Sequence, residues 1–124
     1  MGRDDVGPND VLVHRGDGRT AFRVVRVAVP TEHDWRSHYE QGRPPHRSEI
    51  GSALDHMSLS MFSTPEQARD VTEHFGRRLG SFIAGVELKG EHGIWFSESG
   101  GAGHILVWGR PADLQACLVA VEPV

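Results

Sequence analysis

Short segments of this chain alternate apolar with polar residues, which is the period of a half-buried β-strand. Segment 54–63 is the clearest case. It places Met57, Leu59 and Met61 on one side, and His56, Ser58, Ser60 and Phe62 on the other. Other apolar runs, several of them rich in β-branched residues, also predict strands. These runs are 11–14, 21–29, 81–90, 104–109 and 114–124, with a shorter apolar piece at the start of 93–103.

One segment, 63–80, has the period of an amphipathic helix. Ser63 or Thr64 is suited to the N-cap, and Pro65 falls in the first turn, where proline is tolerated. A stripe at helical spacing would face a sheet, and its members are Ala68, Val71, Phe75 and Leu79. A shorter helix is predicted within 31–41, beginning at Thr31.

The predicted strands come in runs instead of alternating with helices, which favours an α+β domain. We therefore expect a small mixed or antiparallel sheet of about six short strands. It would be accompanied by one main helix at 63–80 and by one or two short helices. Residues 1–9 read as a flexible tail, 42–53 as a loop and 110–113 as a turn, so that 10–124 form a single domain.

Charge, lysine and cysteine content, and the length of the apolar runs exclude or favour several classes of function. The chain has 124 residues and a net charge of −4, which argues against a general nucleic-acid binder. Lys89 is the only lysine among 13 basic residues, so positive charge is almost entirely guanidinium, which suits bidentate binding of phosphate or carboxylate. Cys117 is the only cysteine and lies in an apolar run, which predicts a buried thiol without a disulfide. No apolar run has the length of a membrane span, and no signal peptide is visible, so we expect a cytoplasmic protein.

Three familiar motifs do not fit. The glycine-rich stretch "SESGGAGH" neither follows nor opens a helix, as a dinucleotide fingerprint would. His33 and His38 are five residues apart, which separates them by about 140° around a helix, so no zinc motif forms and no metal is expected. Ser60 has no base beside it in the sequence, which disfavours a serine hydrolase.

A constellation of short segments remains. Arg15 follows a short strand in "LVHRGD", and a serine-rich strand leads into the main helix in "HMSLSMFSTPEQARDV". The strand "SFIAGVEL", the piece "GIWF", a glycine loop and the strand "GHILVWG" come next. This order resembles the ADP-ribosyltransferase-like superfamily, including its RNA 2'-phosphotransferase-like branch.

The resemblance implies a domain that binds NAD or an RNA-end phosphate and, if active, transfers ADP-ribose or cleaves the nicotinamide glycosidic bond. It places Arg15, or His14 beside it, at the position that grips the ligand. Ser60, or Ser58 two residues earlier, would brace the ribose. The late strand begins with His104 where the family has a glutamate, so Glu98 or His104 would supply the polar catalytic group.

Other interpretations stand beside this one. Residues 15–18 could form only a hairpin tip, the serines could be strand-face and cap residues, and Trp95 and Trp108 could be either core residues or a stacking platform. The alternative function is a non-enzymatic protein–protein interaction module, such as an immunity, scaffold or accessory protein. The absent late glutamate supports that alternative.

Overall fold

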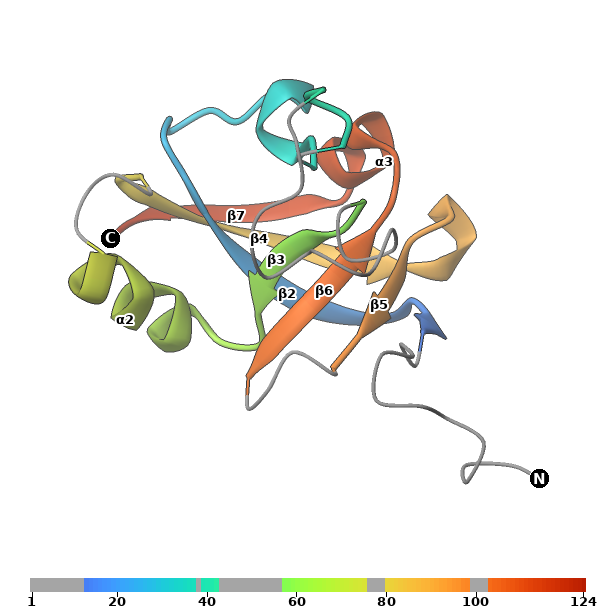
Figure 1. Ribbon diagram of the computed structural model, residues 1–124, viewed down its shortest axis with the longest axis horizontal. Helices are drawn as coiled ribbons and strands as arrows, with labels where there is room; N and C mark the ends of the chain where they lie inside the picture. Colours follow the sequence, from blue (N-terminus) through green and yellow to red (C-terminus); the bar gives the residue numbers. More distant parts are fainter. Residues whose placement is uncertain (1–12, 38, 43–56, 76–79, 99–102) are drawn as a thin grey trace.

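The computed structural model describes residues 13–37, 39–42, 57–75, 80–98 and 103–124. Within these ranges the chain forms seven strands, two α-helices and two 3-10 helices (Figure 1). In chain order they are β1 (His14–Arg15), β2 (Asp17–Val25), the 3-10 helix η2 (Glu32–Trp35), β3 (Leu59–Phe62), α2 (Pro65–Phe75), β4 (Phe82–Lys89), the 3-10 helix η5 (Gly90–His92), β5 (Trp95–Ser97), β6 (His104–Trp108), α3 (Pro111–Ala116) and β7 (Leu118–Pro123).

All described strand pairs are antiparallel, in the order β1-β5-β6-β3-β2-β4-β7. The α+β class predicted from the sequence is confirmed, with seven strands where about six were expected. The additional strand is β5, which the short apolar piece at the start of 93–103 forms. The N-terminal segment continues through residues 14–25 with a single break and forms no hairpin tip.

The interruption between β1 and β2 is Gly16, where the segment changes its strand partner. The Gly16 N–H donates to the Ile94 carbonyl at 2.8 Å, and a Cβ at Gly16 would lie only 2.3 Å from the Leu88 carbonyl oxygen. Before the break, β1 pairs with β5; after it, β2 pairs with β3 and β4. Because β1 and β2 are one continuous segment, the pairings from β2 through β3, β6 and β5 return to their starting strand. A flat sheet cannot close in this way, so these strands curve into a barrel-like arrangement.

The concave side of the curved sheet holds the core. The alternation predicted for 54–63 holds within β3, because Leu59 and Met61 are buried whereas Ser60 is exposed. It is wrong before β3, where the strand has not begun: Met57 is exposed and Ser58 is buried. Buried apolar side chains of β2, β4, β5 and β6 join them, together with residues of η2 and α3. The buried cluster consists of Ala21, Val25, Trp35, Leu59, Met61, Ala84, Val86, Leu88, Ile94, Phe96, Ile105, Val107, Leu114 and Cys117.

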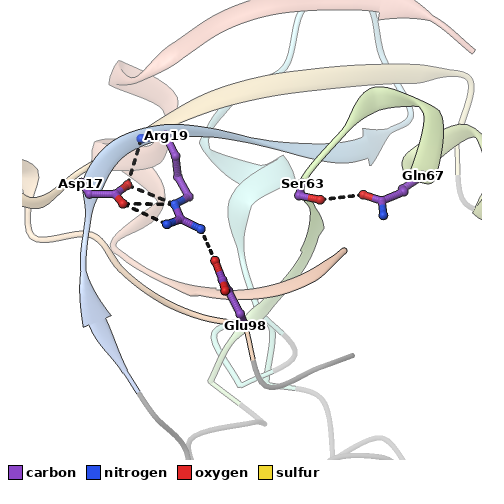
Figure 2. Close-up of polar contacts among 5 residues, drawn as sticks. All are labelled: Asp17, Arg19, Ser63, Gln67 and Glu98. Carbon is purple, nitrogen blue, oxygen red and sulfur yellow. Dashed lines mark hydrogen bonds and ion pairs between the residues drawn. The ribbon is translucent and has the colours of Figure 1, made fainter. Parts of the chain in front are cut away.

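The main helix begins where the sequence predicts. The Gln67 N–H donates to Thr64 Oγ1 at 3.2 Å, which identifies Thr64 as the N-cap. Ser63 instead donates from its hydroxyl to the Gln67 side chain at 2.7 Å (Figure 2). Ala68 is fully buried against the sheet, as the predicted stripe requires.

Two predictions about element bounds are wrong. The segment 110–113 is not a simple turn, and 114–124 is not one strand, because α3 occupies Pro111–Ala116 before β7 begins. Pro111 suits the first turn of α3, and Leu114 is buried, so the helix start and this burial override the apolar run. The strand predicted at 21–29 lies instead at Asp17–Val25, and 26–29 form an exposed bend.

The short helix predicted within 31–41 is only one 3-10 turn, η2. It packs against α3, where Trp35 donates from its indole nitrogen to Gln115 Oε1 at 2.5 Å (Figure 1). Cys117 is buried as predicted, and burial raises the pKa of its thiol.

Several predictions lie outside the described residues: the tail 1–9, most of the loop 42–53, the side chains of Phe75 and Leu79, and residues 99–102 of the glycine-rich stretch. In the part of the chain that the structure describes, no helix is long and apolar enough to cross a membrane.

Thr64 and Ser63 give a direct test of the cap. We expect Thr64→Ala to lower the free energy of unfolding by about 1 kcal/mol, because an N–H of the first turn loses its acceptor. Ser63→Ala removes only an exposed side-chain contact and should have less than half that effect. Urea denaturation of both variants measures the difference, and a larger loss in Ser63→Ala would contradict the assignment of Thr64 as the cap.

Candidate functional site

Strand register places Arg15 on the same sheet face as two tryptophans. Arg15 lies directly opposite Trp95 in the β1–β5 pair, and Trp95 lies directly opposite Trp108 in the β5–β6 pair. Directly opposed residues of antiparallel strands project from the same face of the sheet. Phe96, the neighbour of Trp95, projects into the core instead. The arginine and both indoles therefore occupy the convex face, away from the core.

Ser60 and His104 share this face. Ser60 lies opposite Leu106 in the β3–β6 pair, and Leu106 stands two residues from both His104 and Trp108 along β6. Residues two apart in a strand project to the same side. Ser58, just before β3, is buried. The structure thus brings Arg15, Ser60 and His104, which come from three distant segments, onto one face of β1, β5, β6 and β3.

Ser60 and His104 also contact each other. The Ser60 hydroxyl and His104 Nε2 are hydrogen-bonded, although 44 residues separate them in the sequence. The imidazole additionally packs against the Phe62 ring, with 5.6 Å between ring centroids. The sequence offers Ser60 no neighbouring base, but the β3–β6 register supplies one. The pair presents a hydroxyl oxygen whose hydrogen-bonding geometry is set by an imidazole.

Arg23 fixes the backbone behind Ser60. One guanidinium nitrogen of Arg23 donates to the Ser60 carbonyl at 2.9 Å, and Nε donates to the Asp34 carbonyl at 3.3 Å. Burial lowers the pKa of Arg23 to about 10, against the opposing effect of the Asp34 charge, so the side chain is cationic at neutral pH. Arg23 therefore links β2, β3 and the η2 turn through charged hydrogen bonds.

A cavity of about 650 Å³ opens at the edge of the sheet beside β1. Three residues predicted from the sequence line it: His14, Arg15 and Glu98. Ser60 and His104 are not among its lining residues. The lining side chains within the described residues are Val13, His14, Arg15, Asp17, Arg19, Phe96 and Glu98.

Arg19 organises the polar groups of this cavity. It forms ion pairs with Asp17, at 3.0 Å, and with Glu98, and Figure 2 shows its guanidinium between the two carboxylates. The guanidinium also lies 4.4 Å from the centroid of the Phe96 ring. Hydrogen bonds from Arg19 lower the pKa of Asp17, and the same contacts raise the pKa of Arg19. Glu98 is thus held on the cavity side of β5, apart from the Ser60–His104 pair.

Arg15 also lines the cavity but, unlike Arg19, is not paired with a carboxylate of the described residues. It is exposed, and within the described residues it makes neither an ion pair nor a hydrogen bond. Its stem crosses Gly90, where a Cβ would lie 2.6 Å from Arg15 Cγ. Gly90 therefore leaves room for a cation that stands at the cavity rim and projects from the convex face.

Sequence reasoning missed Arg19 and Asp17, and it left open whether Trp95 lies in the core or on the surface. Asp17 and Arg19 are two residues apart in β2, a spacing that places both on one side of a strand. The two-residue spacing is visible in the sequence, but it was not used because the strand was predicted to begin at residue 21. The 44% exposure of Trp95 has no counterpart in the local pattern.

Comparison with protein-family models, curated proteins and solved structures finds no match for this chain. Among the described residues, no group of three or more histidine, cysteine or acidic side chains is arranged to hold a metal ion. The site must therefore be interpreted from its own residues.

Arg23 provides a test of how the site is held. We expect Arg23→Met to lower the free energy of unfolding by about 2 kcal/mol, because the Ser60 and Asp34 carbonyls lose a charged donor. Arg23→Lys, whose single ammonium serves the two carbonyls less well, should lie between wild type and Arg23→Met. Urea denaturation is the measurement, with Arg69→Ala as control: its ion pair to Glu122 is at the surface and should contribute below about 1 kcal/mol. An unchanged midpoint for Arg23→Met would contradict the assignment.

Proposed function

We propose that this protein binds a nucleotide, either NAD-like or an RNA-end phosphate, across the convex face of β1, β5, β6 and β3. One observation carries the proposal: Arg15, Ser60 and His104 come from distant segments, and strand pairing places them on one face. The resemblance to ADP-ribosyltransferase-like proteins assigns Arg15 and Ser60 to ligand binding and His104 to the polar catalytic group.

Arg15 is the proposed phosphate ligand. A guanidinium binds phosphate oxygens in a bidentate manner and keeps its charge at any physiological pH. Arg19, by contrast, already donates to Asp17 and Glu98. Because Arg15 is exposed and makes no ion pair within the described residues, an incoming phosphate would displace no internal carboxylate. His14, the adjacent residue, lies opposite Phe96 and projects to the core side, where it lines the cavity, so it does not share the convex face with Arg15.

Ser60 is the proposed ribose contact. Its hydroxyl is exposed and can both donate to and accept from a sugar hydroxyl, while His104 sets its orientation. Neighbouring strands lie about 4.8 Å apart, so the three spacings from β1 to β3 cover about 14 Å. A ligand with separate phosphate and sugar groups suits that distance.

The positions of the side chains support binding of a nucleotide better than cleavage of its glycosidic bond. An oxocarbenium-like centre needs a carboxylate close by, and Glu98 is paired with Arg19 on the cavity side. His104 is the polar side chain beside Ser60, so we propose it as the group that would exchange a proton with a bound ligand. Transfer of ADP-ribose or cleavage at nicotinamide would require Glu98 to turn from Arg19 toward the ligand.

Calorimetry tests the phosphate contact. We expect measurable heats of binding with NAD or ADP-ribose, and a roughly tenfold or greater loss of affinity in Arg15→Ala, because a charged hydrogen bond is removed. Arg69→Ala removes an arginine on α2, at the opposite end of the molecule from β5, and should bind like wild type (Figure 1). Wild-type heats indistinguishable from buffer, up to millimolar ligand, would overturn the proposal and favour an interaction module.

A second titration tests the ribose contact. Ser60→Ala should weaken ADP-ribose severalfold while leaving inorganic pyrophosphate unchanged, because only the former carries sugar hydroxyls. Equal weakening of both ligands would show that the substitution disturbs the face as a whole and would remove Ser60 from the ribose contact.

A further inference from the structure

The convex face carries an aromatic row between its polar groups. β5 and β6 lie between β1 and β3, and each contributes one tryptophan to the face. Trp95 is directly opposite Arg15 on one side and directly opposite Trp108 on the other. A ligand that contacts both Arg15 and Ser60 would therefore cross the two strands that carry these tryptophans.

The exposure of Trp95 matters because of its position: it lies between Arg15 and Trp108 on one face, and covering an indole removes a large apolar area from water. Trp95 is 44% exposed, whereas Trp35 is fully buried and hydrogen-bonded to Gln115. Both tryptophans are large enough to serve as core residues, but only Trp35 does so. On β5 the core position belongs to Phe96, which is 3% exposed, so Trp95 is not required to fill the core.

We propose that Trp95 is a stacking platform for a nucleobase, which makes the ligand of this face a nucleotide with an aromatic base. This inference rests on the proposed function and specifies its ligand class. Opposed side chains in antiparallel strands have Cβ atoms about 5 Å apart, so the Arg15 guanidinium and the Trp95 ring can contact one mononucleotide together. Base–aromatic stacking tolerates any base, because every base has a π-face.

The charge of the face agrees with this ligand. Arg15 supplies positive charge at one edge of the row, and the two carboxylates nearest to it in the cavity, Asp17 and Glu98, are paired with Arg19. A phosphate at Arg15 thus meets a cation and no unpaired acid within the described residues of the cavity. A purely apolar partner would contact the Trp95 ring but not the exposed Arg15 guanidinium. A nucleotide can contact both, with its base on the ring and its phosphate on the guanidinium.

The experiment compares AMP with ribose 5-phosphate, which has the same phosphate and sugar but no base. Calorimetry on wild type should show AMP binding more tightly than ribose 5-phosphate. Trp95→Ala should weaken AMP by roughly 5- to 150-fold and leave ribose 5-phosphate unchanged. Trp95→Phe retains a ring and should restore part of the AMP affinity. Arg15→Ala should weaken both ligands.

Controls separate stacking from misfolding. Val119→Ala removes an exposed apolar side chain from β7, at the other end of the strand order, and should bind AMP like wild type. Near-UV circular dichroism should show that Trp95→Phe keeps the native fold. Equal wild-type affinity for the two ligands, or an unchanged AMP affinity in Trp95→Ala, would overturn the platform while leaving phosphate binding intact. Absence of binding by both ligands would overturn the platform together with the proposed function.

Discussion

The close approach of the Gly16 backbone to β4 is the constraint on which the other features depend. A side chain there would collide with the Leu88 carbonyl, so only glycine allows β1 to leave β4 and pair with β5. This exchange of partners curves the sheet and places Arg15 opposite Trp95. The residues on both sides of Gly16, Arg15 and Asp17, line the neighbouring cavity.

Much of the fold could be predicted because its signals are local. The alternation in 54–63 identifies the core side of β3, and the residues around Thr64 and Pro65 identify the start of α2. The wrong bounds arise where two local signals compete. In 110–124 the apolar run suggested one strand, yet a proline just after an N-cap begins a helix, and the buried Leu114 stabilises it against η2.

The site was less predictable because it depends on register. His104 reaches Ser60 only through the β3–β6 pairing, which no spacing in the sequence reveals. Glu98 and His104 were interchangeable candidates in the sequence, whereas the structure places them differently: Glu98 with Arg19 and His104 with Ser60. Arg15 was identified from its position after a short strand, but its lack of an ion pair depends on Arg19 engaging both nearby carboxylates.

Core residues alternate with convex-face residues along β3, β5 and β6, and this determines which substitutions the protein can accept. Leu59, Met61, Phe96, Ile105 and Val107 maintain the fold from one side of these strands. Ser60 and Trp95, at alternate positions, are exposed on the convex face, although Ser97 on the same side of β5 is buried. The backbone carbonyl of Ser60, not its side chain, is bound by Arg23. Stability and recognition are therefore encoded at alternate positions of the same strands. Substitutions can redirect what the convex face recognises, one side chain at a time, while the interior that holds the strands together remains untouched.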